Sequence, residues 1–434
     1  MSGAGAAAGQ PARGPMRALV LSPDIPGHGG GRDPEARLAE AMALAEALPG
    51  VTLEGGEVVR VDRPRAGTIF GSGKIAGIGA RIEAAEIGLV VIDGPVTAIQ
   101  QRNLEREWGA KVLDRTGLIL EIFAARARTR EGVLQVELAA LSYQRTRLVR
   151  AWTHLERQRG GLGFVGGPGE TQIEADRRAI DEQITRLRAR LEKVRRTRGL
   201  HRAARARAPH PVVALVGYTN AGKSTLFNRL TGAGVTSEDQ LFATLDPTMR
   251  GIDLPGGGRA ILSDTVGFIA DLPVELVAAF RATLEEVRAA DIIIHVRDVA
   301  HPESAAQARD VATVLDEIGV SDQVPVIEAW NKIDLLAAGM CAEARAAAGR
   351  DPLRVALSAA TGEGMEALRE AIAAIARGSR REAVLTLGHD EGRARAWLHE
   401  HGLVTAEEPG EGGVTLRVRW SGEEAGRFAR EFGR

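Results

Sequence analysis

Gly217-Tyr-Thr-Asn-Ala-Gly-Lys-Ser224 is the stretch that decides the fold of this 434-residue chain. The apolar run 211–216 precedes it and the helical pattern 225–230 follows it, so the spacing G-x-x-x-x-G-K-S lies between a strand and a helix. Glycines let such a loop curl with its amides facing phosphate groups at the helix N-terminus. We therefore predict a P-loop site in which Lys223 reaches the β- and γ-phosphates and Ser224 binds Mg²⁺.

Two further motifs supply what phosphate hydrolysis needs. Asp264-Thr-Val-Gly267 follows a short apolar strand, so we expect its aspartate to hold Mg²⁺ through water and its glycine amide to meet the γ-phosphate. Phe242-Ala-Thr-Leu-Asp-Pro-Thr248 lies between this motif and the P-loop. It contains the threonine that should complete the Mg²⁺ shell, for which we choose Thr244, with Thr248 as the alternative.

Two motifs nearer the C-terminus predict the base. Asn331-Lys-Ile-Asp334 ends the strand pattern 324–330, and an aspartate there accepts hydrogen bonds from N1–H and the 2-amino group of guanine, which adenine lacks. Ser358-Ala359 ends another strand pattern, and its backbone can contact guanine O6. The sequence thus predicts a GTPase with Mg²⁺ as cofactor and Lys223, Thr244 and Gly267 as catalytic residues. The metal ligands are Ser224, Thr244 and, through water, Asp264. The predicted nucleotide-binding residues are Gly217, Tyr218, Thr219, Asn220, Ala221, Gly222, Lys223, Ser224, Thr225, Asp264, Gly267, Asn331, Lys332, Asp334, Ser358 and Ala359.

Phe268 follows the Asp-Thr-Val-Gly motif directly. Ras-like enzymes carry at this place the glutamine that orients the attacking water. Phenylalanine cannot do so, and we therefore predict slow hydrolysis in the isolated protein, completed by a partner. The alternative is that another group of the same chain orients the water.

The fold class is α/β, with a P-loop GTPase domain at residues 209–380. An N-terminal α/β domain with a parallel sheet is expected at 17–130, because apolar runs alternate there with helical patterns. A helical hairpin follows at 131–208 and a small α+β domain at 381–434. The Ala/Gly/Pro-rich residues 1–16 predict a disordered tail.

Heptad spacing of apolar residues predicts the hairpin. Leucines and tryptophan from Leu134 to Leu155, and isoleucines, leucines and valine from Ile173 to Val194, follow one another at spacings of three, four or seven residues, as in helices that pack along a narrow seam. Between them, residues 159–169 contain six glycines, so we expect a tip loop between two arms of about 35 Å at 1.5 Å per residue. A flexible linker is the alternative. The second arm is basic, with twelve Arg/Lys against three Asp/Glu at 177–207.

Overall composition narrows the class of protein. The net charge is −1, and charged residues make up 26% of the chain, as in ordinary soluble proteins. The single cysteine, Cys341, excludes an intramolecular disulfide. No stretch is long and apolar enough for a membrane span. We predict a monomer in the cytoplasm without stable membrane insertion, with partial membrane association left open.

Several of these segments resemble the HflX family of GTPases. The resemblance covers roughly residues 17–380 and includes Asp264–Pro273 and Phe242–Thr248. It extends upstream to Gln101–Leu104, Asp114–Leu120, Ile122–Phe123, Arg126–Glu131, Leu134–Leu138, Gly167–Glu170 and Asp176–Arg178. Gly166 departs from the pattern, because an arginine is expected there, so no particular tip contact is carried over.

The resemblance implies a bacterial protein that binds the 50S ribosomal subunit and uses GTP in ribosome splitting, rescue or subunit quality control. The hairpin 131–208, with its glycine tip at 159–169, would reach toward the peptidyl transferase region of the 23S rRNA. A basic arm suits rRNA phosphates. The family's N-terminal region has also been linked to ATP, but no second P-loop sequence supports this here.

Two alternatives stay open. One is a ribosome-assembly scaffold whose GTP cycle times its release. The other is a tRNA-modifying GTPase, which normally ends in a cysteine-containing motif, whereas this chain ends Phe432-Gly-Arg434 and has its cysteine within the GTPase domain. GTP hydrolysis stimulated by 50S subunits would favour the ribosome-splitting or rescue function over both alternatives.

Overall fold

The structure is a computed structural model that describes residues 15–27, 32–158, 168–206, 210–232, 242, 248–256, 258–269, 281–378, 381–410, 412–420 and 422–433. The chain divides into an N-terminal unit, which extends to Arg188, and a C-terminal unit, which begins at Ala189. We describe each unit by itself.

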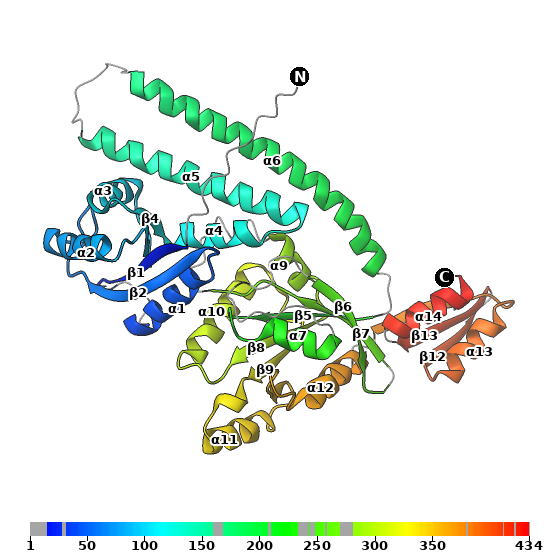
Figure 1. Cartoon of the computed structure of the whole chain (residues 1–434). Coiled ribbons are helices and arrows are strands. Elements are labelled where there is room, and N and C mark those ends of the chain that lie inside the picture. Colours follow the sequence, from blue (N-terminus) through cyan, green and yellow to red (C-terminus); the bar gives the residue numbers. More distant parts are fainter. Residues whose placement is uncertain are drawn as a thin grey trace, which may run out of the picture. The chain divides into compact units, whose positions relative to one another are not determined.

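The N-terminal unit contains a parallel sheet with the strand order β2-β1-β3-β4. Its strands are β1 (Met16–Asp24), β2 (Val51–Arg60), β3 (Leu89–Ile92) and β4 (Lys111–Asp114). Its helices are α1 (Pro34–Glu46), α2 (Ser72–Ala84), α3 (Ala98–Trp108) and α4 (Arg115–Arg126), as Figure 1 shows. The predicted parallel α/β domain is therefore confirmed. The sequence did not reveal β2, because its glycine- and glutamate-rich run lies half-buried at the sheet edge.

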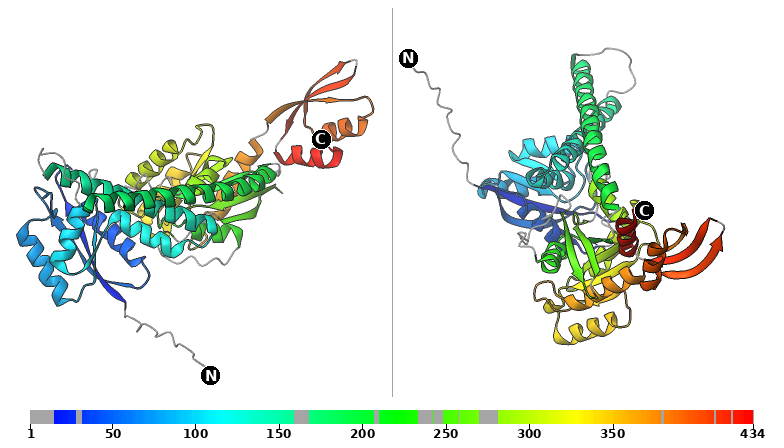
Figure 2. Two further views of the ribbon diagram at one scale, coloured as in Figure 1. Left: turned by 90° about the horizontal axis from the view of Figure 1, so that it is seen from above. Right: turned by 90° about the vertical axis from the view of Figure 1, so that its right-hand side faces the viewer.

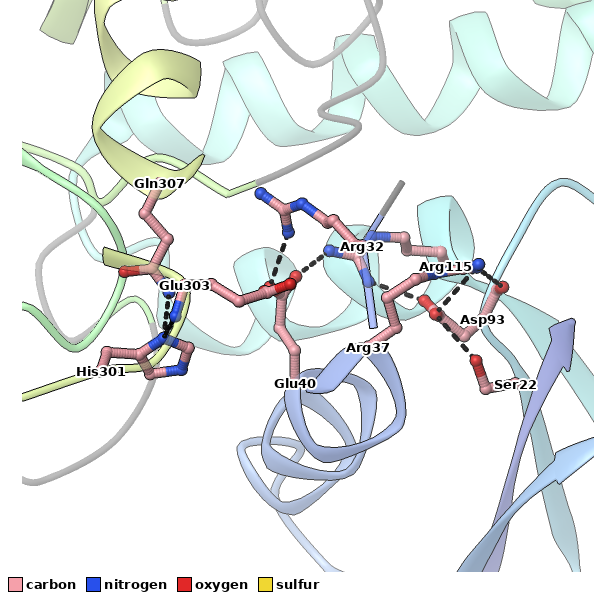
Figure 3. Close-up of polar contacts among 9 residues, drawn as sticks. All are labelled: Ser22, Arg32, Arg37, Glu40, Asp93, Arg115, His301, Glu303 and Gln307. Carbon is pink, nitrogen blue, oxygen red and sulfur yellow. Dashed lines mark hydrogen bonds and ion pairs between the residues drawn. The ribbon is translucent and has the colours of Figure 1, made fainter. Parts of the chain in front are cut away.

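Charged side chains fill the carboxyl ends of β1 and β3, the place where open α/β sheets usually bind ligands. Arg115 Nη1 lies 2.6 Å from Asp93 Oδ1, and Arg115 also pairs with Glu40. Arg37 Nη2 and Ser22 Oγ each lie 3.5 Å from Asp93 Oδ2, so these groups converge on one buried carboxylate (Figure 3). This ion-pair cluster joins α1, α4 and the sheet.

Two long helices follow, α5 (Arg130–Gln158) and α6 (Pro168–Ala206), and Arg145 of α5 pairs with Asp181 of α6 at 3.1 Å. Both views show them running side by side (Figures 1 and 2). Their lengths of 29 and 39 residues correspond to about 44 and 58 Å at 1.5 Å per residue, longer than the arms we predicted. The helix begins at Pro168, a favoured first helical residue, so the last two residues of the predicted tip are helical. The rest of the tip lies outside the described residues.

The first arm buries more than one narrow seam. Ile184 and Leu187 of α6 are buried as the heptads predict. In α5, however, Gln135, Val136 and Ala139 are buried beside Leu134. The reason is that α5 also packs on α3 and α4 of the α/β domain. The hairpin is therefore anchored on that domain through its first arm.

The C-terminal unit contains the GTPase domain, whose sheet has the strand order β10-β9-β8-β5-β7-β6. Only β6 is antiparallel to its neighbour. The strands are β5 (Val212–Gly217), β6 (Thr248–Leu254), β7 (Gly258–Asp264), β8 (Ile292–Asp298), β9 (Val326–Asn331) and β10 (Arg354–Ala356). The helices are α7 (Lys223–Thr231), α9 (Arg281–Arg288), α10 (Ser304–Glu317), the short η1 (Ile333–Leu335), α11 (Ala338–Ala348) and α12 (Met365–Gly378). The predicted strand–loop–helix setting of the P-loop is confirmed, and so are the strands that lead to Asp264, Asn331 and Ser358.

A smaller three-stranded antiparallel sheet, in the order β11-β13-β12, follows. Its elements are β11 (Arg381–Leu387), α13 (Gly392–Glu400), β12 (Val404–Gly410), β13 (Gly413–Trp420) and α14 (Gly422–Phe432). Leu398, Leu416, Val418 and Phe428 form its core. The predicted α+β module is confirmed, although β12 and α14 were not foreseen. In the described part of the chain, every helix is too short or too polar to span a membrane.

Candidate nucleotide-binding site

The loop between β5 and α7 has a backbone that only particular residues can adopt. Gly217 has φ +154°, and a Cβ there would lie 2.3 Å from the Val296 carbonyl oxygen. Gly222 has φ +94°, and a Cβ there would lie 2.2 Å from Asn331 Nδ2. Both positions therefore require glycine. Asn220, with φ +59°, is a residue type that tolerates this region.

Lys223 is buried at the start of α7. Its Nζ donates to the carbonyl oxygens of Gly217 at 3.0 Å and Tyr218 at 2.8 Å. Burial lowers the pKa of this ammonium group to about 8, although the nearby Asp264 carboxylate opposes the shift. Burial of this ammonium group is unfavourable without an anion nearby, so its position fits a site that receives anionic phosphates.

Ser224 and Asp264 bring two hard oxygen donors together. Ser224 Oγ donates to Asp264 Oδ2 at 2.9 Å, and the carboxylate is 2% exposed at the end of β7. Hydroxyl and carboxylate oxygens are the protein ligands that Mg²⁺ takes beside phosphate oxygens, so the donor set fits this ion. Thr244 lies outside the described residues. Thr248, the alternative, is the first residue of β6 and is paired in register with Asp264 on β7.

The segment after β7 is docked on the P-loop. Thr219 N donates to Phe268 O at 2.7 Å, and Phe268 N donates to Gly217 O at 3.1 Å. The Phe268 ring is 4% exposed. A Cβ on Gly267 would lie 2.9 Å from Thr219 Cγ2 and 3.0 Å from Lys223 Nζ, so a larger residue would crowd the phosphate loop. Phe268 thus serves the packing of this segment.

Asn331 connects the phosphate loop to the base-side loop. Its Nδ2 donates to Ala221 O at 2.8 Å, and its Oδ1 accepts from Ala359 N at 2.9 Å. The side chain is 2% exposed, so it acts by holding two loops together. The sequence motif placed this residue at the base but did not indicate this role.

The other two residues of this motif lie differently. Lys332 has φ +67° and its Nζ pairs with Asp298 Oδ2 at 2.8 Å. Asp334 is exposed in η1, as a carboxylate that receives a base must be. Asp298 was missed in the sequence reading, although it ends β8 at the same sheet edge as the other motifs. An acidic residue at that edge was the signal that could have identified it.

Arg229 was also missed. It lies on α7, and its Nε donates to Ala359 O at 3.2 Å while its Nη2 donates to Ala360 O. Residues 217–225, 331, 332, 334, 358 and 359, all predicted to bind nucleotide, are thus brought to one edge of the sheet together with Asp264 and Gly267. This edge lies at the carboxyl end of β5. The sheet continues from β5 through β8 on one side and through β7 on the other, and open α/β sheets bind ligands at such a reversal of strand order.

His295 of β8 lies on the opposite face of its strand from Ile294 and Val296 and is 7% exposed. Burial, together with the charge of Arg297, lowers its pKa to about 4, although Glu328 opposes the shift. The folded protein therefore binds this proton less readily than the unfolded chain. We expect the free energy of unfolding to have its full value above pH 6.5. It should fall by up to about 3 kcal/mol as the pH drops toward 4, because the unfolded chain then takes up a proton that the folded protein does not.

Urea unfolding between pH 4.5 and 8 measures this effect. His295→Gln should flatten the profile in that range, whereas the exposed His389→Gln should leave it unchanged. Equal pH slopes for His295→Gln and the unchanged protein would contradict the assignment.

Comparison with known proteins agrees with this geometry. Residues 35–124 match a family model described as GTP-binding GTPase N-terminal, and 126–205 match GTP-binding GTPase Middle Region. Residues 212–332 match 50S ribosome-binding GTPase, and 343–434 match HflX C-terminal domain.

Curated relatives match along most of the chain. GTPase HflX of Magnetococcus marinus is 50% identical over 404 residues, covering 93% of this chain and 92% of its own. GTPase HflX of Escherichia coli is 47% identical over 361 residues, covering 82% and 83%. Among solved structures, the complex of SsGBP with GDP has a TM-score of 0.50 and 25% identity, covering 83% of this chain and 98% of that one. A GTP-binding protein of Sulfolobus solfataricus in complex with GDP, at 24% identity and a TM-score of 0.46, covers the same shares. The chain therefore belongs to the HflX family of GTPases and hydrolyses GTP.

Proposed function

We propose that this GTPase binds the 50S ribosomal subunit, that contact with the subunit accelerates its GTP hydrolysis, and that the cycle serves to split ribosomes. The observation that carries the proposal is the match of residues 212–332 to a 50S ribosome-binding GTPase family. It is supported by α6, in which Arg186, Arg188 and Arg190 are exposed while Ile184, Leu187 and Leu191 are buried. Exposed arginines suit rRNA phosphates.

We further assign the roles at the nucleotide. Lys223 neutralises charge on the β- and γ-phosphates, and the Gly267 amide contacts the γ-phosphate. Ser224, Thr244 and, through water, Asp264 hold Mg²⁺, which neutralises developing charge on the phosphate oxygens when bound. Asp334 accepts hydrogen bonds from guanine, and the 358–360 segment meets its O6.

Slow basal hydrolysis follows from Phe268. Because its ring is buried and its backbone is bonded to the P-loop, this residue leaves the attacking water to be oriented by a group that the ribosome contributes or orders. The ribosome is thus the proposed trigger of hydrolysis.

Co-sedimentation with 50S subunits at several salt concentrations tests the binding surface. The double variant Arg188→Glu/Arg190→Glu should lower affinity by at least about tenfold and flatten the salt dependence, since phosphate contacts are lost. Arg309→Glu, an exposed arginine of α10, is the matched control and should bind normally.

Light scattering of 70S particles then tests the cycle. The protein with GTP should dissociate them, and the Arg188→Glu/Arg190→Glu variant should not. Normal 50S binding by that variant would contradict the proposal that the arginines of α6 bind the 50S subunit. Binding confined to immature subunits would replace splitting with assembly as the function.

A further inference from the structure

We infer that Arg229 is a positioning residue for guanine recognition, because it orients the one amide of the base-side loop that remains to meet O6. This inference rests on the proposed guanine site and names a group within it. Arg229 lies on α7, the helix that follows the phosphate loop, and its side chain reaches the segment after β10.

The hydrogen bonds of that segment leave little choice of donor. Ser358 N donates to Glu363 O at 3.0 Å, and Ala359 N donates to Asn331 Oδ1 at 2.9 Å. Thr361 N donates to Ser358 Oγ at 3.1 Å, and Gly362 N donates to Ser358 O at 2.8 Å. Among the described residues, the amide of the exposed Ala360 alone has no such acceptor in this run. It is therefore the amide that is available to a base, rather than that of Ala359.

Arg229 fixes the direction of this amide. Its Nε holds the carbonyl oxygen of Ala359 at 3.2 Å. That carbonyl and the N–H of Ala360 belong to the same planar trans peptide, so they point to opposite sides. Because the carbonyl is turned toward α7, the Ala360 N–H is turned away from α7.

A second contact makes the arrangement rigid. Arg229 Nη2 also donates to the carbonyl oxygen of Ala360, so one planar guanidinium spans two successive carbonyls. Gly362, with φ +94°, lies against the same group, since a Cβ there would be 3.5 Å from Nη1. A lysine lacks this planar fork of donors and would fix the two carbonyls less rigidly.

The function of this arrangement is selectivity. Guanine O6 accepts a hydrogen bond, whereas adenine carries an amino group at the same place and would oppose one N–H with another. The Ala360 amide contributes to selectivity only while its N–H is held in the direction of the base. Arg229 therefore acts on the base through Ala360, without touching it.

Nucleotide binding by the full-length protein, measured by calorimetry with three probes, tests this inference. GDP carries O6 and the 2-amino group, 6-thio-GDP replaces O6 with a weakly accepting sulfur, and IDP lacks only the 2-amino group. Arg229→Gln should weaken GDP binding by roughly tenfold, the value of about one hydrogen bond. It should weaken 6-thio-GDP binding much less, so the preference for GDP over 6-thio-GDP falls, and the preference for GDP over IDP stays.

Two further variants complete the design. Arg229→Lys should retain part of the GDP preference. Arg369→Gln is the matched control, because Arg369 Nη2 also donates to a backbone carbonyl, that of Leu230 at 3.2 Å, outside the base-side loop. It should leave all three affinities unchanged.

Unchanged GDP affinity in Arg229→Gln, or equal losses for GDP and 6-thio-GDP, would overturn the inference and leave Arg229 a structural contact. Failure of the guanine site itself would show differently. In that case the unchanged protein would not prefer GDP over IDP, whatever Arg229 did.

Discussion

Asp334→Asn should exchange the base selectivity of this GTPase from guanine to xanthine. In the proposed site the carboxylate accepts two hydrogen bonds from guanine, and charged hydrogen bonds contribute about 1.5–3 kcal/mol each. Their loss predicts a fall in GDP affinity of roughly 10²- to 10⁴-fold. Xanthine carries an oxygen in place of the 2-amino group, so the asparagine amide can donate to it, and XDP affinity should rise.

Calorimetric titration of both diphosphates measures this exchange. Asp334 is exposed and forms no hydrogen bond or ion pair within the described structure, so the fold should be unaffected. Asp322→Asn, an exposed aspartate in the loop before β9, is the matched control. If Asp334→Asn still preferred GDP, the carboxylate would not be the group that reads the base.

Lys223→Met should abolish hydrolysis while leaving the fold intact. Removing one preorganised donor from a developing charge costs about 10²- to 10³-fold in rate, and this ammonium is expected to contact two phosphates, so we expect a loss of at least about 10³-fold. Stability of the free protein should change by less than about 2 kcal/mol. The reason is that burial already disfavours this charge, as its pKa of about 8 shows, and methionine relieves that cost.

The two carbonyls that Lys223 holds keep other donors. Gly217 O also accepts from Phe268 N at 3.1 Å, and Tyr218 O accepts from Ala221 N at 3.3 Å. Single-turnover GTP hydrolysis and thermal unfolding with and without GDP measure the two effects. Lys74→Met is the control, since Lys74 lies in the only other Gly-Lys cluster that resembles a phosphate loop in sequence. Unfolding of Lys223→Met at much lower temperature without nucleotide would contradict this account.

The nucleotide motifs could be predicted because each lies at a strand end and binds through local geometry. Gly217, Gly222 and Lys223 are specified by backbone sterics and spacing, and the fold places them as expected. The two glycines of the cluster 71–74 favour a turn by composition, but Ser72 begins α2 with Gly71 as its N-cap. A glycine at a helix start and one in a turn look the same in sequence.

Long-range contacts could not be predicted. Arg229 and Ala359 are separated by 130 residues, and Asn331 reaches Ala221 across 110. No periodicity encodes such pairs, because they exist only after the sheet has ordered its strands. In the same way, the burial of Val136 and Ala139 in α5 depends on a neighbour that the heptad pattern does not contain. Thr244 and residues 159–167 of the tip lie outside the described residues and stay predictions.

The rate of GTP hydrolysis with and without purified 50S subunits tests the central claim most directly. We expect slow turnover by the protein alone and an increase of at least about 10²-fold with saturating 50S subunits, because a partner that completes such a site supplies 10³- to 10⁵-fold in related GTPases. The stimulation should weaken as salt rises and should be lost in the Arg188→Glu/Arg190→Glu variant. An identical rate with and without 50S subunits would contradict the account.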